Sequence, residues 1–164
     1  MKKLAVFVLI LVLTIGLGAF LFNPFRAPSS VSKTEIVNLD TDSDDVAALK
    51  LQEAGFIKSM GAFDIALTIK NKHNKIQPGG YYLSKNMDAW QIIDQVTKGP
   101  DLKWVTIREG MRKEQIGEIL KSTFGWSDED LQKWNNTYTA MKFDYTEGVY
   151  FPDTYLIPVK ENGL

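Results

Sequence analysis

The chain has 164 residues, of which 45% are hydrophobic and 24% are charged, and its formal net charge is -1. It contains no cysteine, which excludes disulfide bonds, a thiolate nucleophile and a lipid-modified cysteine anchor. Residues 1–26 hold three basic residues and no acid, so the rest of the chain sets 16 Lys and Arg against 20 Asp and Glu. This mildly acidic part, at about −4, does not suit a nucleic-acid partner.

An uncharged apolar stretch runs from Leu4 to Phe22, directly after Lys2 and Lys3. As a helix it would rise roughly 28 Å, close to the hydrocarbon thickness of about 30 Å. We therefore expect residues 1–26 to form a cytoplasmic tip and an uncleaved transmembrane anchor, in a single-pass protein of the plasma (inner) membrane whose bulk is extracytoplasmic. A cleaved signal peptide is the alternative, although its apolar region is usually shorter and ends at a small-residue site.

Proline and serine are frequent just after this stretch, in NPFRAPSSVSK, which resists helix formation and contributes little apolar area. We interpret residues 27–34 as a linker. The alternation in EIVNL then predicts a short strand over residues 35–39.

A helix is predicted next, because Thr41 and Asp44 have the spacing of a capping box and Gly55 suits a C-cap. Its expected apolar positions are Val46, Ala47, Leu49 and Ala54. The following piece, residues 62–70, fits both a strand and a helix, and helix is favoured.

A turn at Pro78, Gly79 and Gly80 is predicted to lead into a short strand over residues 81–83. The helix after it has Ala89, Ile93 and Val96 on one face and is stopped by Lys98, Gly99 and Pro100.

A third strand is predicted over residues 102–107, followed by a helix over residues 112–125. Ser127 and Asp130 have capping-box spacing and predict one more helix start. Short strands and amphipathic helices of this kind indicate an α+β fold rather than a sheet of long parallel strands.

Most generic kinds of site find no support in the sequence. His73 is the only histidine and lies in a polar run, so we expect a solvated turn and neither a histidine metal site nor a catalytic triad. No nucleotide-binding glycine motif occurs. Trp90 and Trp134 are expected to pack in the core, whereas Trp104 and Trp126 remain candidates for stacking on sugar rings.

The stretch EGVYFPDTYLIP, residues 147–158, holds the acids Glu147 and Asp153. An acid/base pair for glycoside hydrolysis needs carboxyl groups about 5–10 Å apart, whereas six extended residues span roughly 20 Å, so a sharp turn would be required. A structural corner is the alternative interpretation.

The order of four motifs resembles the N-terminal half of the YceG-like family of endolytic murein transglycosylases. These motifs are AGFIKS, IQPGGYYLSKNMDAWQIIDQVTKG, VTIREGMRKEQIGEIL and EGVYFPDTYLIP, and the resemblance covers residues 35–158. It implies a LysM-like α+β subdomain over residues 35–107 after the anchor. Residues 108–164 would form a helical connection and the start of a catalytic domain.

The resemblance also implies what this chain lacks. The family's catalytic glutamate belongs to a downstream helix that does not occur here, so we expect a truncated member that is inactive alone. Glu147, Tyr150, Asp153 and Thr154 are the expected substrate-binding residues, and Glu147 is the second choice for the catalytic acid. Phe151 and Tyr155 are expected to pack this segment against the core.

The complete enzyme would cleave the bond between N-acetylmuramic acid and N-acetylglucosamine and leave 1,6-anhydro ends. No metal or organic cofactor is implied. The implied partners are peptidoglycan glycan strands and the membrane, with the cell-wall synthesis machinery as a further candidate. Two alternatives stay open, namely a membrane-anchored peptidoglycan-binding or scaffold module without activity, and an unrelated exported α+β domain.

Overall fold

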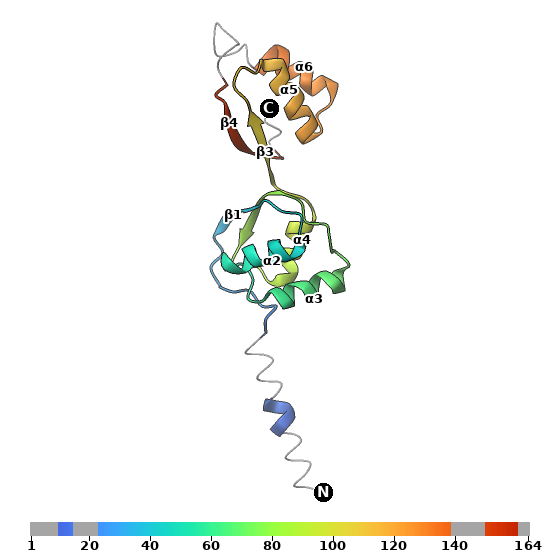
Figure 1. Ribbon diagram of the computed structural model, residues 1–164. Helices are drawn as coiled ribbons and strands as arrows, with labels where there is room; N and C mark the ends of the chain where they lie inside the picture. Colours follow the sequence, from blue (N-terminus) through green and yellow to red (C-terminus); the bar gives the residue numbers. More distant parts are fainter. Residues whose placement is uncertain (1–9, 15–22, 139–149, 161–164) are drawn as a thin grey trace.

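The computed structural model of the protein describes residues 10–14, 23–138 and 150–160. Apart from residues 10–14, these form two lobes stacked along the long axis and joined at a narrow waist (Figure 1). The N-terminal lobe contains β1 (Thr34–Leu39), α2 (Asp44–Glu53), α3 (Met60–Lys70), β2 (Gly79–Ser84) and α4 (Ala89–Thr97). The C-terminal lobe contains β3 (Leu102–Ile107), α5 (Lys113–Phe124), α6 (Asp128–Lys133), the π-helix η1 (Trp134–Tyr138) and β4 (Asp153–Pro158). The α+β class expected from the sequence is confirmed.

The strands form one four-stranded sheet in the order β1-β2-β3-β4, with antiparallel neighbours. β1 pairs with β2 along the full length of both strands, and β3 pairs with β4 in the same way. Between these two ladders, the described pairing joins Gly80 of β2 to Leu102 of β3. The helices lie on one face of the sheet, which leaves the other face open (Figure 1).

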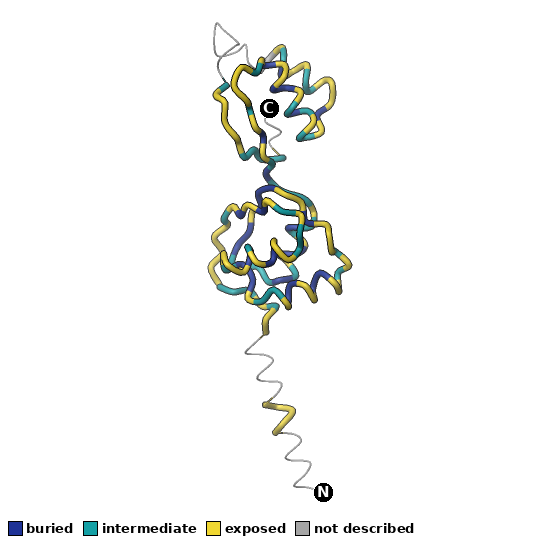
Figure 2. The backbone as a smooth tube through the Cα atoms, in the orientation of Figure 1, coloured by how far each residue is buried: buried dark blue, intermediate teal, exposed yellow. Residues whose placement is uncertain are grey.

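Alternation along β1 and β2 builds the core of the N-terminal lobe. Val37 and Leu39 are buried while Ile36 and Asn38 are exposed, so one face of the strand meets the helices. Tyr81 and Leu83 of β2 are completely buried on the same face. They pack with side chains of α2, α3 and α4 in a single hydrophobic cluster. Figure 2 shows stretches of buried residues on several elements of this lobe.

The C-terminal lobe has a separate and smaller core. Its buried members are Val105 of β3, Ile116 and Leu120 of α5, and the rings of Trp126 and Trp134. Because the two clusters share no residue, each lobe buries its own apolar surface.

The apolar face of α2 differs from the expected one. Val46 and Leu49 are more than two-fifths exposed, whereas Ala47, Ala48 and Leu51 are buried. The buried face of α2 is therefore rotated by part of a helical turn from the face that the sequence predicted. The expected cap also differs, because Ser43 is the N-cap and the Thr41 hydroxyl accepts a hydrogen bond from the Ser43 amide instead, at 3.0 Å. The N-cap Ser43 makes no side-chain capping bond.

Other helix signals are confirmed. Residues 62–70 are helical within α3, which begins at an N-cap, Ser59, whose side chain accepts a hydrogen bond from the amide of Ala62. Ser127 and Asp130 form the predicted capping box at the start of α6. Gly55 and Gly125 follow α2 and α5 with positive φ, which suits glycine after a helix C-terminus.

The segment NPFRAPSSVSK, residues 23–33, which includes most of the expected linker 27–34, contacts the N-terminal lobe. The ring of Phe25 stacks on Trp90 with centroids 5.4 Å apart, and the Phe25 carbonyl accepts a hydrogen bond from the Ala89 amide. Further along, the amide of Ser29 donates to the carbonyl of Lys85 at 3.0 Å. These contacts fix residues 25–29 to the start of α4 and the end of β2.

Most of the predicted anchor, residues 4–22, lies outside the described residues. Its described part, residues 10–14, is helical and exposed. Within the described ranges, no helix is long and apolar enough to cross a bilayer.

Gly79 and Gly80 belong to β2 at the waist, where the sequence predicted only a turn before the strand. A Cβ atom on Gly79 would lie 2.5 Å from Cβ of Pro100 and 2.7 Å from the carbonyl oxygen of Leu102. A Cβ atom on Gly80 would lie 3.1 Å from methyl groups of Leu102 and Leu156. Glycine is required here because the backbone of β2 approaches the start of β3 too closely for a side chain.

Substitution of Gly79 by Ala is expected to lower the free energy of unfolding by about 1–3 kcal/mol, because the added methyl group must displace Pro100 or the Leu102 carbonyl. The matched control is Gly61→Ala on the exposed side of α3, where the added atom meets nothing closer than the Ser59 hydroxyl at 3.8 Å. That control should be neutral or stabilising by up to about 1 kcal/mol. Urea unfolding followed by circular dichroism measures both, and equal stability of the two variants would contradict the prediction.

Candidate functional site

The segment EGVYFPDTYLIP leads into β4, the outer strand of the C-terminal lobe (Figure 1). Residues 150–158 are described, whereas Glu147, the second choice for a catalytic acid, lies outside the described residues. The structure therefore places three of the four expected substrate-binding residues, namely Tyr150, Asp153 and Thr154.

Tyr150 lies against the aromatic core of the C-terminal lobe. Its ring centroid is 5.4 Å from that of Trp134, and its side chain is half-buried. It borders an apolar cavity of about 280 Å³ under β4. The other lining residues are Ile107, Ile116, Leu120, Trp134, Phe151, Tyr155 and Ile157. The cavity offers apolar walls with few polar groups, which suits packing better than sugar recognition.

Asp153 and Thr154 are exposed on β4. The Thr154 hydroxyl lies 3.1 Å from the hydroxyl of Thr106 on β3, so both hydroxyls sit on the open face of the sheet. Asp153 Oδ1 accepts a hydrogen bond from the Thr154 amide at 2.7 Å. The expected site residues therefore lie on different sides of β4, with Tyr150 towards the core and Thr154 towards solvent.

The expected packing of Phe151 against the core was wrong. Its side chain is 76% exposed, because it precedes β4 and lies outside the ladder that presses alternate residues onto α5. Tyr155 is also partly exposed, and its hydroxyl donates to the Phe151 carbonyl at 3.0 Å. This bond closes the corner around Pro152, which has no amide proton of its own to contribute.

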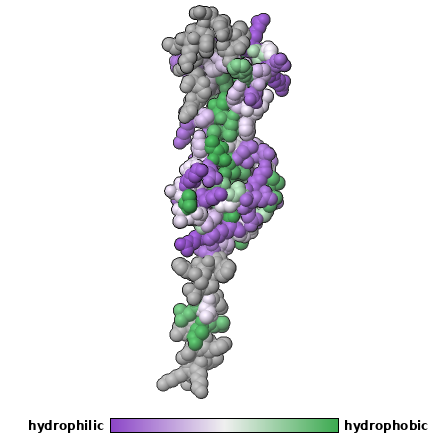
Figure 3. All heavy atoms as spheres, turned by 90° about the vertical axis from the view of Figure 1, so that its left-hand side faces the viewer, coloured by the Kyte–Doolittle hydropathy of each residue, from purple (hydrophilic) through white to green (hydrophobic). Residues whose placement is uncertain are grey.

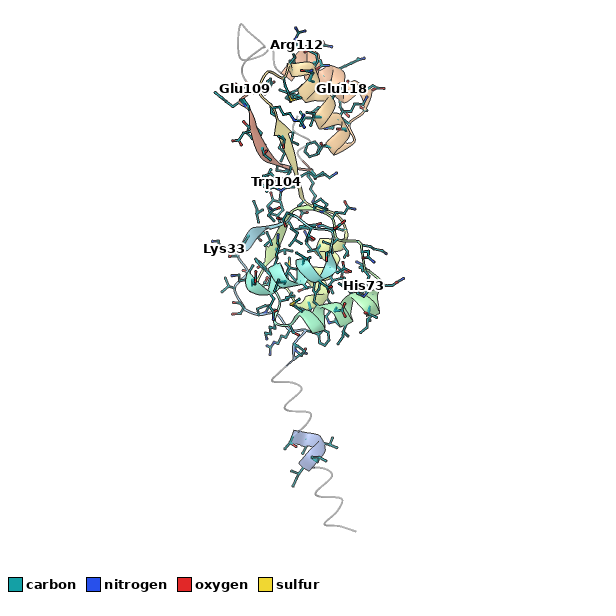
Figure 4. The ribbon with its side chains drawn as sticks, in the orientation of Figure 1. Lys33, His73, Trp104, Glu109, Arg112 and Glu118 are labelled. Carbon is teal, nitrogen blue, oxygen red and sulfur yellow. The ribbon has the colours of Figure 1, made fainter. Side chains whose placement is uncertain are left out.

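The four tryptophans differ in exposure. Trp126 and Trp134 are buried with ring centroids 6.0 Å apart, and Trp90 is half-buried under Phe25. Trp104 on β3 is 43% exposed, and its indole N–H donates to the side chain of Asn38 on β1 at 3.0 Å. Figure 4 shows it at the level of the waist. Trp104 is thus the most exposed of the four tryptophans, and Trp126, which is buried, no longer qualifies for stacking on a sugar ring.

His73 has a structural role in this fold. Its ring bonds the Asp44 carboxylate and the Thr68 hydroxyl, both at 3.0 Å, and so joins the loop after α3 to the start of α2. Among the described residues, no group of three or more His, Cys, Asp or Glu side chains could hold a metal ion.

Several carboxyl groups are held as anions by lysines. Hydrogen bonds from Lys70 and Lys72 hold the pKa of Asp94 below its usual value, and a hydrogen bond from Lys121 does the same for Asp128. A general acid for glycoside cleavage needs the opposite shift, a raised pKa. Asp94 and Asp128 are therefore unsuited to that role.

Sequence reasoning missed a hollow of about 400 Å³ at the waist. It is lined by Tyr82, Lys98, Gly99, Pro100, Asp101, Pro158, Val159 and Lys160. The run Lys98, Gly99, Pro100 was interpreted only as a helix stop. A second lysine shortly after β4 was the available signal, but only the fold shows that the two cations share one hollow.

Comparison with known proteins gives two matches. The family model described as the YceG-like family matches residues 37–163. A 2.6 Å crystal structure of a YceG-like protein from Listeria monocytogenes is similar with 18% sequence identity and a TM-score of 0.46. The match covers 76% of this chain and 48% of the Listeria chain, so this chain spans about half of that protein's length. No curated protein sequence gives a significant match.

The contrast between buried and exposed tryptophans can be measured. Trp134→Phe should lower the free energy of unfolding by about 1–3 kcal/mol, because it removes buried ring area and the indole hydrogen bond to the Lys113 carbonyl. Trp104→Phe, the matched control at the exposed site, should change it by less than about 0.5 kcal/mol. Similar losses in the two variants would contradict the assignment of Trp104 to the surface.

Proposed function

This chain belongs to the YceG-like family, and from that membership we propose that it is part of a membrane-anchored peptidoglycan lytic transglycosylase. The observation that carries the proposal is the extent of the family match, which reaches from β1 through β4 and includes both lobes.

The reaction of such an enzyme needs one acid/base group. A carboxylic acid protonates the oxygen that joins N-acetylmuramic acid to N-acetylglucosamine, and the bond from this oxygen to the muramyl anomeric carbon breaks. The muramyl 6-hydroxyl attacks that carbon and gives its proton to the carboxylate, which regenerates the acid. The products are a free N-acetylglucosamine end and a 1,6-anhydro end, and no water is consumed.

Residues of the EGVYFPDTYLIP segment hold the glycan in this proposal and do not perform the chemical step. The exposed Thr154 hydroxyl and Asp153 carboxylate are available to sugar hydroxyls, and Tyr150 fixes the segment to Trp134. The general acid itself is assigned to none of the residues of this chain, with Glu147 as the second choice.

The N-terminal lobe supports a role in binding the cell wall. Its elements follow the order β1, α2, α3, β2, with both strands in one antiparallel pair and both helices on the same face. We propose that it is the LysM-like subdomain and binds glycan strands. The anchor over residues 4–22 would hold it outside the plasma (inner) membrane.

A binding or scaffold module without activity is the second candidate. It is favoured by one observation, namely that the N-terminal lobe buries a hydrophobic core of its own, separate from that of the C-terminal lobe. The reading frame after Leu164 separates the two candidates. A continuing frame that encodes a glutamate-bearing helix supports the enzyme, and a stop codon supports the module.

The anchor can be tested by fractionation. The protein should sediment with membranes, and protease added from outside should digest the part of the chain after residue 26, because the apolar stretch is long enough to span. Recovery of a soluble exported product that begins after about residue 22 would show a cleaved signal peptide instead.

We expect this chain to bind peptidoglycan without cleaving it. The chain should be retained on purified sacculi but release no 1,6-anhydromuropeptides by mass spectrometry, since loss of a general acid typically costs about 10²–10⁴ in rate. Glu147→Gln should weaken retention on sacculi, because Glu147 is an expected substrate-binding residue, and should still release no anhydro products. Anhydro products that disappear in Glu147→Gln would make Glu147 the catalytic acid, and lack of retention on sacculi would contradict a peptidoglycan function.

A further inference from the structure

The hollow at the waist is built by the joint between the two lobes. One wall comes from the end of α4 and the turn after it, with Lys98 and Pro100, and another from the end of β4, with Pro158 and Lys160. Tyr82 of β2, 38% exposed, borders the hollow from the N-terminal lobe. Both lobes must therefore be in place for the hollow to exist.

The described residues that line the hollow carry a net positive charge. Asp101, the one acid among them, is engaged within the fold, because its Oδ2 accepts hydrogen bonds from the Tyr82 amide at 3.0 Å and the Gln95 side chain at 2.7 Å. Lys98 lies 3.4 Å from Asp101 Oδ1, and half of its side chain is exposed. Lys160 is exposed and makes no ion pair with any other residue in the described part of the chain. Among the described lining residues, the two ammonium groups thus outnumber the single carboxylate of Asp101.

An aromatic surface lies next to this hollow on the open face of the sheet. Pro158 is opposite Leu102 in the β3–β4 ladder, and Leu156 is opposite Trp104 two residues further on. Two residues of a strand span about 7 Å, so the indole ring and the hollow are neighbours on one face. Figure 3 looks onto this side of the molecule and shows apolar residues running from one lobe to the other through the waist.

The indole ring is held in position before any ligand binds. Its N–H is occupied by Asn38, which anchors the ring to β1 and leaves a ring face to solvent. Pyranose rings present an apolar C–H face that packs on aromatic side chains, and a fixed ring loses little conformational entropy on binding.

We propose that the waist binds one peptide-bearing sugar unit of peptidoglycan, with the pyranose on Trp104 and a carboxylate of the peptide in the hollow beside Lys98 and Lys160. This rests on the proposed function, because peptidoglycan is taken as the ligand. A neutral glycan would leave the two lysines unused. A polyanion would be repelled by the acidic remainder of the chain, which carries about −4 without residues 1–26.

The test uses the full chain in detergent with three soluble probes measured by calorimetry. The probes are a disaccharide-tripeptide muropeptide, the same muropeptide with its peptide carboxylates amidated, and chitotetraose. The wild-type protein should bind the first probe at least about threefold more tightly than the second. A difference of this size is what the loss of one solvent-exposed ion pair is expected to cause. Binding of the first probe should also change tryptophan fluorescence, because Trp104 is the exposed indole.

Two variants separate the sugar contact from the charge contact. Trp104→Ala should lower the affinity for all three probes by about three- to tenfold. The double variant Lys98→Ala, Lys160→Ala should lower the affinity only for the muropeptide with free carboxylates, by about three- to tenfold. It should therefore bind the free and the amidated muropeptide equally well. Asn38→Ala, which releases the ring but keeps it, should give a smaller loss than Trp104→Ala and serves if Trp104→Ala fails to fold.

The matched controls are Lys58→Ala, an exposed lysine beside a different hollow, and Ile69→Ala, an exposed apolar side chain on α3. Both should bind like the wild type. Equal affinity of the wild type for free and amidated muropeptides, or unchanged binding after the waist substitutions, would overturn the inference. If the protein is still retained on sacculi in that case, the peptidoglycan function stands and only the binding site at the waist is excluded. Lack of any retention of the wild-type protein would reject both the proposed function and the site at the waist.

Discussion

The close approach of Gly79 and Gly80 to Pro100 and Leu102 is the constraint on which the rest of the structure depends. Each lobe buries its own core, and between them the sheet narrows to one paired position. The Asp101 carboxylate reinforces this joint by accepting hydrogen bonds from β2 and α4. A side chain on β2 at this point would separate the ladders, and the open face of the sheet would no longer run from one lobe to the other.

The open face continues from one lobe to the other, so the two faces of the sheet have different roles. The covered face buries the separate core of each lobe, and the open face keeps hydroxyls and rings available to solvent. Thr106 and Thr154 lie on it in the C-terminal lobe, and Trp104 reaches from there to Asn38 in the N-terminal lobe. A long polymer is a suitable ligand for such a face, because its successive units can contact both lobes.

Local chemistry explains which parts of the fold could be predicted from the sequence. Ser127 and Asp130 cap α6 as expected, since a capping box depends only on residues three apart. Val46 was misplaced because in α2 the small side chain of Ala48 is the one pressed against the core, and its small apolar surface gives a weak periodic signal. The hollow at the waist could not be predicted, since Lys98 and Lys160 come together only through the pairing of β3 with β4.

The docking of the segment before β1 has a mechanical consequence. Phe25 is stacked on Trp90, and backbone hydrogen bonds tie its carbonyl to Ala89 and the Ser29 amide to Lys85. A force or torque applied to the chain at residue 23 is therefore transmitted directly to α4, whereas a flexible linker would absorb it. Since α4 ends in the wall of the waist, tension on the N-terminal end would bear on the joint between the lobes.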